Sequence, residues 1–279
     1  MRRPEEVEPA RAPHQAVAVL IPTLGRPNRI QPLLDNLNAT TTGDFTAYFI
    51  VEQDDAPTID AVRQAGAGLI INDGPPTYAS CINTAYRQTD EPYLFLGADD
   101  IVFLDRWFEA AVAEMADSKV GVVGTADPHH PLPDHSSHSL VRRRYIEEQS
   151  GCMDLRDTVL YPYRHGFTDH ELVGVAKSRH AYRYCESSCV EHHHPGWDSL
   201  GRVRGGATLD ATYQKGNRHH RLDTMTFIER SRKWSHLIDN PGPIDIRVQK
   251  FIRRNSGIRG AVRYNLRRLT DAIAEGLGR

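Results

Sequence analysis

Tyr93-Leu94-Phe95-Leu96-Gly97-Ala98-Asp99-Asp100-Ile101-Val102-Phe103 is the stretch that decides the fold of this 279-residue chain. Residues 93–96 are uncharged and bounded by turn formers, so they predict a short buried strand. Two adjacent carboxylates follow, and such a pair is costly to desolvate unless a cation such as Mg²⁺ or Mn²⁺ neutralises it. Open α/β sheets bind ligands at this end of their strands, so the stretch indicates a metal and phosphate site. The alternative is an Asp pair that only caps a helix near Leu104.

Strands and helices alternate on both sides of this stretch. Apolar runs that end in turn formers predict strands over residues 16–21, 47–51, 68–71 and 120–123. Apolar residues at helical spacing predict helices from residue 30 onward and over residues 59–65, 77–87 and 104–117. Strands that alternate with single helices form right-handed βαβ units. The N-terminal half therefore predicts an α/β fold, with a mostly parallel sheet flanked by helices.

The regular pattern stops after Thr125. Residues 127–139 contain Pro, Ser, Asp and four His without periodicity, and we interpret them as a long surface loop of the kind that forms lids. The pattern returns with a helix from Asp169 and a strand over residues 182–190, which ends in Glu191-His192-His193-His194-Pro195. The rest of the chain predicts helices around residues 209–215, 222–237, 244–252 and 258–277, with a linker at 239–243.

The composition indicates a soluble protein with a sizeable core. A formal net charge of −2 gives no general attraction to nucleic acid or to an anionic membrane. Four cysteines are too few for a disulfide scaffold, and no segment reaches the ~20 apolar residues of a membrane-spanning helix. We therefore expect a cytoplasmic protein. The segment from Arg247 to Arg279 carries nine Lys or Arg against two acidic residues, which leaves open a peripheral membrane contact or a homo-oligomer through these helices.

In their order, these features resemble the GT-A fold nucleotide-sugar glycosyltransferases, family 2 in particular. The residues that carry the resemblance are Pro22-Thr23 with Arg26, Glu52, Asn83, Ala98-Asp99-Asp100 and Thr168-Asp169-His170-Glu171-Leu172. The resemblance implies a GT-A domain over residues 15–238, with a nucleotide-binding half over about 15–125 and an acceptor half over about 126–238. Residues 1–14 would form a flexible tail, and residues 244–279 would form basic C-terminal helices.

The resemblance also implies roles for individual residues. Asp169 takes the position of the catalytic base, with Glu171 on the same helical turn as the competing candidate. Asp100 would bind the metal together with a histidine after the next strand, His192 in preference to His193 or His194. The nucleotide would be bound by Pro22, Thr23, Arg26, Glu52, Asn83 and Asp99. Two positions depart from the family pattern, because Gly97 stands where many members carry the first Asp and Thr168 replaces a Glu.

The implied activity is that of an inverting, metal-dependent glycosyltransferase. It would move a sugar from a nucleotide-diphosphate donor, with UDP the expected nucleotide and Mn²⁺ or Mg²⁺ the cofactor, to a hydroxyl of a glycan, a lipid, a protein or a modified nucleic-acid base. A carboxylate base would take the hydroxyl proton, and a single displacement inverts the sugar carbon. The alternatives are a nucleotidyltransferase of sugar phosphates and a catalytically inactive GT-A-like binding module. A zinc site built from Cys185, Cys189, His192 and His194 is a further alternative for the His run.

Overall fold

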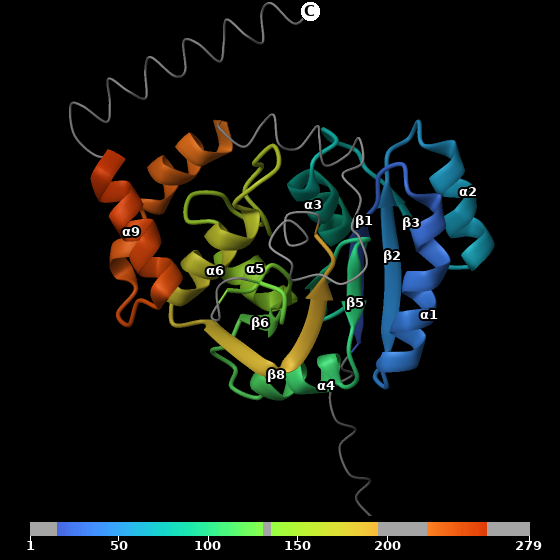
Figure 1. The fold of residues 1–279 in the computed structure, drawn as a ribbon, viewed down its shortest axis with the longest axis horizontal. Helices are drawn as coiled ribbons and strands as arrows, with labels where there is room; N and C mark the ends of the chain where they lie inside the picture. Colours follow the sequence, from blue (N-terminus) through green and yellow to red (C-terminus); the bar gives the residue numbers. More distant parts are fainter. Residues whose placement is uncertain (1–15, 131–134, 195–221, 256–279) are drawn as a thin grey trace, which may run out of the picture.

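The computed structural model describes residues 16–130, 135–194 and 222–255 (Figure 1). The predicted tail over residues 1–14 and the predicted helices around 209–215 and 258–277 lie outside these ranges. An eight-stranded sheet in the order β3-β2-β1-β4-β7-β6-β8-β5 forms the centre of the molecule. Its strands are β1 (Val17–Pro22), β2 (Phe45–Val51), β3 (Gly68–Ile71), β4 (Tyr93–Leu96), β5 (Ile101–Phe103), β6 (Val122–Ala126), β7 (Ser139–Arg142) and β8 (Tyr182–His192).

The predicted α/β fold is confirmed, and its parallel strands form the N-terminal half of the sheet. β1 pairs in parallel with β2 and β4, and β2 pairs in parallel with β3. β7 runs antiparallel to both β4 and β6, whereas β6 and β8 are parallel. β5 then pairs antiparallel with the end of β8. The sheet therefore changes from parallel to mixed pairing at β4, the strand that precedes the two aspartates.

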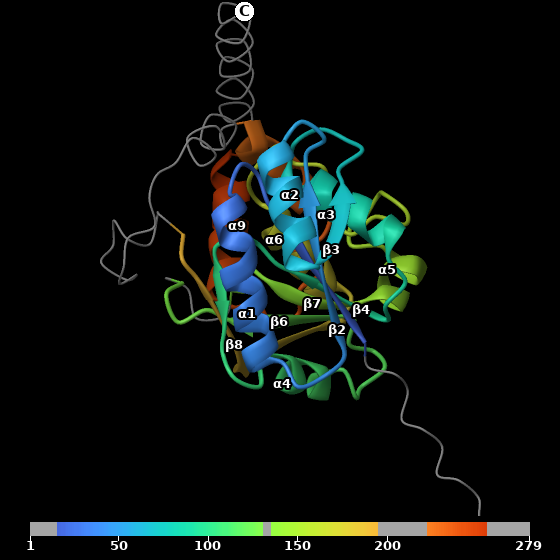
Figure 2. The same cartoon turned by 90° about the vertical axis from the view of Figure 1, so that its right-hand side faces the viewer.

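Helices cover both faces of the sheet. They are α1 (Ile30–Thr40), α2 (Ala56–Ala65), α3 (Tyr78–Gln88), α4 (Trp107–Glu114), α5 (Arg143–Gln149) and α6 (Thr168–Ser178), with a short 3₁₀ helix η1 (Pro27–Arg29) before α1. Alternate residues of β1 belong to different cores: Val19 packs with α1, α2 and α4, whereas Leu20 packs with α3, α5 and α6. Figure 2 shows α1 and α5 on opposite sides of the sheet. The sheet is thus buried on both faces, as its apolar strands require.

Local signals explain most helix boundaries. The Asp55 carboxylate accepts a hydrogen bond from the Thr58 backbone N–H (3.3 Å) at the start of α2, and the Thr77 hydroxyl accepts one from the Ser80 N–H (3.2 Å) at the start of α3. The predicted helix over residues 104–117 is shorter in the structure, where α4 spans Trp107–Glu114. Its first turn is lost because the three apolar residues before Leu104 form β5, and Arg106 adopts a left-handed conformation.

The interpretation of residues 127–139 as a surface loop is wrong for their C-terminal part. His135, Ser136 and His138 are buried. Thr125 donates to the His138 carbonyl from its N–H (3.2 Å), and the ring of His138 hydrogen-bonds to the Leu96 carbonyl at the end of β4 (2.9 Å). The chain then continues as β7 and α5, two elements that lack a clear apolar period. These hydrogen bonds join segments that are distant in sequence, so local periodicity does not reveal them.

A third, smaller core lies at the C-terminal end of the described chain. It packs Tyr163 and Val175 against Phe227, Trp234 and Ile238. A Cβ on Gly174 of α6 would meet the Trp234 ring at 2.2 Å, so only glycine allows this close approach. The surrounding elements are a helix over residues 222–231, the 3₁₀ helix η2 (Ser235–Leu237) and α9 (Pro243–Asn255). The division into a domain over 15–238 and basic helices over 244–279 stays a prediction.

Over the part of the chain that the structure describes, every helix is too short or too polar to cross a bilayer.

Candidate active site

A cavity of about 930 Å³ opens where β1, β2 and β4 end. β1 lies between β2 and β4, so the carboxyl ends of these parallel strands meet at one edge of the sheet. Residues from β8 and from the start of α6 complete the wall. The predicted site residues that line the cavity are Pro22, Thr23, Arg26, Glu52, Asp99, Asp100, Asp169 and His192. Eight of the nine predicted residues are therefore brought together.

Asp99 is the most deeply buried of the cavity carboxylates. Its Oδ1 accepts hydrogen bonds from Arg26 Nη1 (2.6 Å) and Arg29 Nη1 (3.1 Å). Burial and the neighbouring Asp100 carboxylate raise the pKa of Asp99 to about 6, while the two guanidinium groups act in the opposite direction. Asp99 Oδ2 is buried and has no hydrogen-bond partner among the described residues. One oxygen is therefore held by arginines, and the other is available to a ligand.

Asp100 faces the histidine run at the end of β8. Its Oδ1 lies 3.4 Å from His192 Nε2, and its backbone carbonyl accepts a hydrogen bond from the His193 N–H (2.8 Å). Burial lowers the pKa of His192, but the Asp100 carboxylate more than offsets this, so the pKa lies above its usual value. His192 and His194 line the cavity, whereas His193 does not. The structure thus places the predicted metal-ligand pair, Asp100 and His192, side by side.

Asp169 lies between two imidazole rings in the first turn of α6. Its Oδ2 is 2.8 Å from His135 Nε2, and its Oδ1 is 3.1 Å from His170 Nδ1. Burial raises the pKa of Asp169, but the two histidines and their hydrogen bonds hold it well below its usual range. The helix begins at Thr168, so Asp169 is not the N-cap residue. The carboxylate is therefore ionised at neutral pH and faces the cavity.

Glu171, the competing candidate for the base, points elsewhere. It is fully buried, and both of its oxygens accept hydrogen bonds from Arg230. Oε2 also accepts one from the hydroxyl of Tyr163 (2.6 Å). Glu171 does not line the cavity. Its contacts join α6 to the helix over residues 222–231, so the structure gives it a role in packing.

Asn83 is the predicted nucleotide-binding residue that the structure does not bring into the cavity lining. Its amide nitrogen donates to the Leu160 carbonyl (2.8 Å), and its Oδ1 accepts from the N–H groups of Val159 and Leu160. All of its amide groups are thus engaged with one loop, and its role is to hold that loop on α3. Glu52, in contrast, lines the cavity, with its Oε1 accepting from the amide of Asn72 (2.9 Å).

The structure adds cavity residues that sequence reasoning missed, among them His135, His138 and Tyr78. His135 and His138 come from the segment interpreted as a surface loop, and burial lowers the pKa of each to about 4. The hydroxyl of Tyr78, at the start of α3, is buried without a hydrogen-bond partner among the described residues. The only feature of the sequence that could have indicated a cavity wall here was the presence of four histidines in residues 127–139. Their composition alone does not distinguish a solvated loop from a cavity wall.

Asp223 holds the loop that leads into α6. Its carboxylate accepts hydrogen bonds from the backbone N–H groups of Arg164 (3.0 Å), His165 (2.7 Å) and Gly166 (2.8 Å). These three residues line the cavity, and Phe167 after them adopts a left-handed conformation before the helix starts. Three N–H donors on one buried carboxylate fix the loop, and so fix where Asp169 enters the cavity.

The alternative zinc site of Cys185, Cys189, His192 and His194 does not form among the described residues. The thiol of Cys185 hydrogen-bonds to the Ala110 carbonyl at 3.6 Å, and His192 faces Asp100.

Comparisons with known proteins add information at the level of the fold. No protein-family model matches this sequence, and no curated protein matches it. Solved structures do match, among them glucosyl-3-phosphoglycerate synthase from Mycobacterium tuberculosis in complex with Mn²⁺, UDP and glucosyl-3-phosphoglycerate. That chain is 13% identical, with 72% of this chain and 81% of that chain covered and a TM-score of 0.53. The same enzyme with Mn²⁺ and UDP-glucose is 12% identical, with 67% and 74% covered and a TM-score of 0.51. These likenesses show a shared fold and confirm the predicted GT-A architecture.

Proposed function

We propose that this protein is a metal-dependent glycosyltransferase that uses a nucleotide-diphosphate sugar, with UDP as the nucleotide. The observation that carries the proposal is the meeting of Asp100, His192 and Asp169 in one cavity at the end of β4. That cavity is built on the fold of an enzyme solved with Mn²⁺ and UDP-glucose. A metal-ligand pair and a separate carboxylate base are the two groups that a metal-dependent, inverting sugar transfer from a nucleoside diphosphate uses.

Asp100 and His192 would hold the Mn²⁺ or Mg²⁺ ion. Their ligand atoms are 3.4 Å apart, close to the roughly 3 Å between neighbouring ligands of an octahedral ion bound at ~2.1 Å. The two side chains are mostly buried and lie on the cavity wall, so the residues present fit the ion. When bound, the metal supplies positive charge that stabilises the departing diphosphate.

The nucleotide would lie along the ends of β1, β2 and β4. Glu52, which directly follows β2, would accept a hydrogen bond from the base, and Asp99 Oδ2 would accept one from a ribose hydroxyl. Pro22 and Thr23 lie where β1 ends, and the Thr23 N–H donates to the Ile50 carbonyl of β2 (2.9 Å). Arg26 holds Asp99 and adds positive charge near the phosphates. Hydrogen bonds within the protein hold Arg26, Glu52 and Asp99 in place before a ligand arrives.

Asp169 would take the proton from the acceptor hydroxyl. Its lowered pKa keeps the carboxylate ionised, and the contacts with His135 and His170 orient it. A single displacement assisted by one base inverts the sugar carbon, so we propose an inverting reaction. The acceptor is a hydroxyl of a glycan, a lipid, a protein or a modified nucleic-acid base.

Calorimetry with UDP and Mn²⁺ tests the donor site. Asp100→Ala removes a metal ligand, so its UDP affinity is expected to fall to the value measured without metal. Asp90→Ala is the matched control, because Asp90 is an exposed carboxylate shortly before β4, the strand that Asp100 follows. Equal UDP affinity in the wild type and in Asp100→Ala, each with Mn²⁺, would remove the metal site from this cavity.

Hydrolysis of UDP-sugars without an acceptor tests the activity itself. A transferase releases free sugar and UDP slowly from its own donor, and the rate should require Mn²⁺ or Mg²⁺. An inactive binding module binds UDP without releasing sugar. A nucleotidyltransferase instead forms a nucleotide-sugar and pyrophosphate from a nucleoside triphosphate and a sugar phosphate, so pyrophosphate release identifies that alternative.

A further inference from the structure

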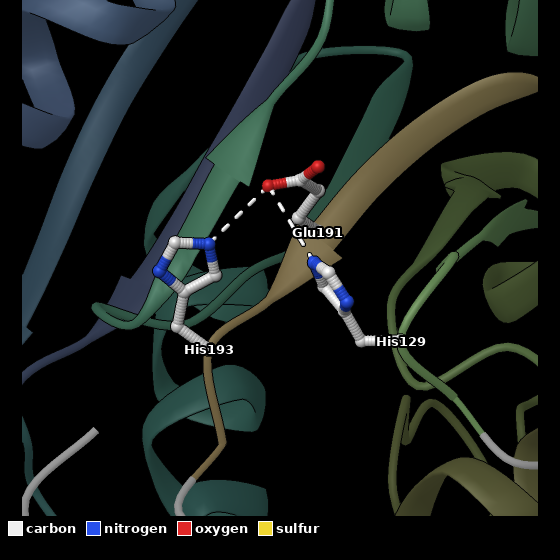
Figure 3. Close-up of side chains that lie close together, drawn as sticks. All are labelled: His129, Glu191 and His193. Atoms are coloured by element: carbon white, nitrogen blue, oxygen red, sulfur yellow. Dashed lines mark hydrogen bonds and ion pairs between the residues drawn. The ribbon is translucent and has the colours of Figure 1, made fainter. Parts of the chain in front are cut away.

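A second cluster of metal-binding side chains lies outside the cavity, around the end of β8 (Figure 3). Side chains alternate along a strand, and His192 and His194 are the ones that line the cavity. Glu191 and His193 do not line it and face the other way. His129, from the loop that follows β6, meets them there, as Figure 3 shows. None of these three residues has a role in the proposed transfer reaction.

The three side chains have the spacing of ligands around one ion. His193 Nε2 lies 3.3 Å from Glu191 Oε2, and His129 Nε2 lies 3.8 Å from the same oxygen. All three ligand atoms lie within 4.8 Å of one another. Two ligands of a tetrahedral zinc ion, each bound at ~2.0–2.1 Å, are about 3.3 Å apart. Small movements of the rings would therefore complete three of four zinc positions.

Backbone hydrogen bonds hold the three residues in place. The Asp127 carboxylate accepts from the N–H of His129 (3.0 Å) and from that of His192 (3.4 Å), which ties the loop to β8. The His193 N–H donates to Asp100, and Glu191 lies opposite Val102 in the ladder between β5 and β8. The side chains are between a fifth and two-fifths exposed, so an ion and a water ligand can reach them. The site is preformed and accessible.

The donor set selects the class of ion. Two imidazoles and one carboxylate suit zinc and neighbouring transition metals, whereas Mg²⁺ and Ca²⁺ prefer oxygen ligands. The alternative is a cluster without a metal, in which Glu191 Oε2 accepts a hydrogen bond from an N–H of each imidazole ring. The two accounts differ in whether zinc binds with the three side chains acting together.

We propose that His129, Glu191 and His193 bind a structural zinc ion that is separate from the donor metal. The ion joins the loop after β6 to the end of β8. His130 follows the ligand His129, and His192 lies between the ligands Glu191 and His193. Both of these neighbours line the cavity, so the zinc ion holds two segments of the cavity wall in place from outside. It takes no part in the transfer reaction, because its ligands do not face the cavity.

Zinc titration of the full chain tests the site, after removal of metals with a chelator. The Asp100→Ala variant is used as the background, so that the donor-metal site does not contribute. Zinc is expected to bind at this cluster, and His129→Ala or His193→Ala in this background should each weaken binding by more than the ~10–100-fold typical of losing a mere supporting contact. Cobalt(II) as a coloured probe should give a visible absorption band that each substitution abolishes. Zinc should also raise the Tm of the background variant and not that of its His129→Ala derivative.

His180→Ala is the matched control. His180 and Asp239 form an exposed pair with 3.7 Å between Nε2 and Oδ2, and they belong to no three-residue group among the described residues. Zinc affinity should be unchanged in this variant. Glu191→Gln, a conservative change, guards against misfolding and should weaken zinc binding while the circular dichroism stays that of the wild type. Zinc affinity that survives all three cluster substitutions would assign the ion to other histidines and overturn the proposal, as would the absence of zinc binding in the Asp100→Ala background.

Discussion

At the scale of single residues, Asp169 is held by two histidines, His135 and His170. His135 is buried, with burial lowering its pKa to about 4, so it is neutral at physiological pH. A neutral ring donates one N–H to the carboxylate and orients it without taking up the acceptor proton. The lowered pKa of Asp169 makes it a weak but fully ionised base. Positioning therefore matters more than basicity at this residue.

Asp169→Asn is expected to lower sugar release from the preferred UDP-sugar by ~10²–10⁴-fold, the range typical of general-base catalysis. The amide keeps the shape of the carboxylate and much of its hydrogen bonding but cannot accept a proton. Binding of UDP with Mn²⁺ should stay at the wild-type level, because the proposed donor site lies on Asp99 and Asp100. Steady-state kinetics and calorimetry on the same preparation measure both quantities.

Glu171→Gln is the control for this variant. Glu171 is enclosed by Arg230 and Tyr163, so its substitution should reduce stability while the folded protein keeps its rate. Near-normal sugar release in Asp169→Asn, together with an inactive but folded Glu171→Gln, would move the base to Glu171.

At the scale of elements, Arg230 joins the helix over residues 222–231 to α6. It donates to both oxygens of Glu171 and to both oxygens of Asp154, and its guanidinium lies 3.4 Å from the centre of the Tyr161 ring. The side chain is 7% exposed, so water does not replace these contacts when they are lost. Because α6 carries Asp169 and the joined helix carries Asp223, this ion pair fixes two elements of the cavity relative to each other.

Arg230→Met is expected to lower the free energy of unfolding by about 3–5 kcal/mol, because Glu171 is left as a buried charge without its partner. Urea unfolding followed by circular dichroism measures this loss. The double variant Arg230→Met, Glu171→Leu removes the buried charge as well and should regain part of the lost stability. Additive losses in the double variant would show that the two side chains do not form a coupled pair.

At the scale of the whole molecule, the cavity encloses several histidines in their neutral form. Burial lowers the pKa of His135, His138 and His194 to about 4. Between about pH 6.5 and pH 4 the unfolded chain binds protons at these rings that the folded chain does not bind. Stability contributed by these rings is therefore lost as the pH falls through this window. His192 and Asp99, each with a raised pKa, act in the opposite direction, but these two groups oppose three.

The Tm is accordingly expected to fall as the pH is lowered from 7 to 5. One fully buried histidine contributes a slope of up to ~1.4 kcal/mol per pH unit to the free energy of unfolding. Differential scanning calorimetry of the wild type and of His138→Gln checks this, since the variant lacks one such ring and should show a shallower slope. His180→Ala, which removes an exposed ring, should keep the wild-type slope. A Tm independent of pH over this range would contradict the assignment of neutral buried rings.

Local pattern determined much of the fold. Each strand of the parallel half follows from a short apolar run between turn formers, and β3 and β4 have the bounds that the sequence predicts. Asp99 and Asp100 could be predicted to lie at the cavity because they closely follow a buried strand, and this order can be read from the local sequence. Asp169 could be placed in the first turn of a helix for the same reason. These features depend on interactions within a few residues, which the amino-acid order contains directly.

Tertiary structure decided which other polar side chains join the predicted ones in the cavity and which of them turn away. His135 and Asp169 are 34 positions apart, and their contact depends on how β7 returns the chain to β4. Asn83 lies on a correctly predicted helix, yet its amide turns to Leu160, 77 positions away. Asp169 and Glu171 share one helical turn, and contacts with distant residues decide which of them faces the cavity: His135 holds Asp169, whereas Arg230 holds Glu171. The physical reason is that a side chain's surroundings are set by packing between distant segments, whereas periodicity records only whether a position is buried.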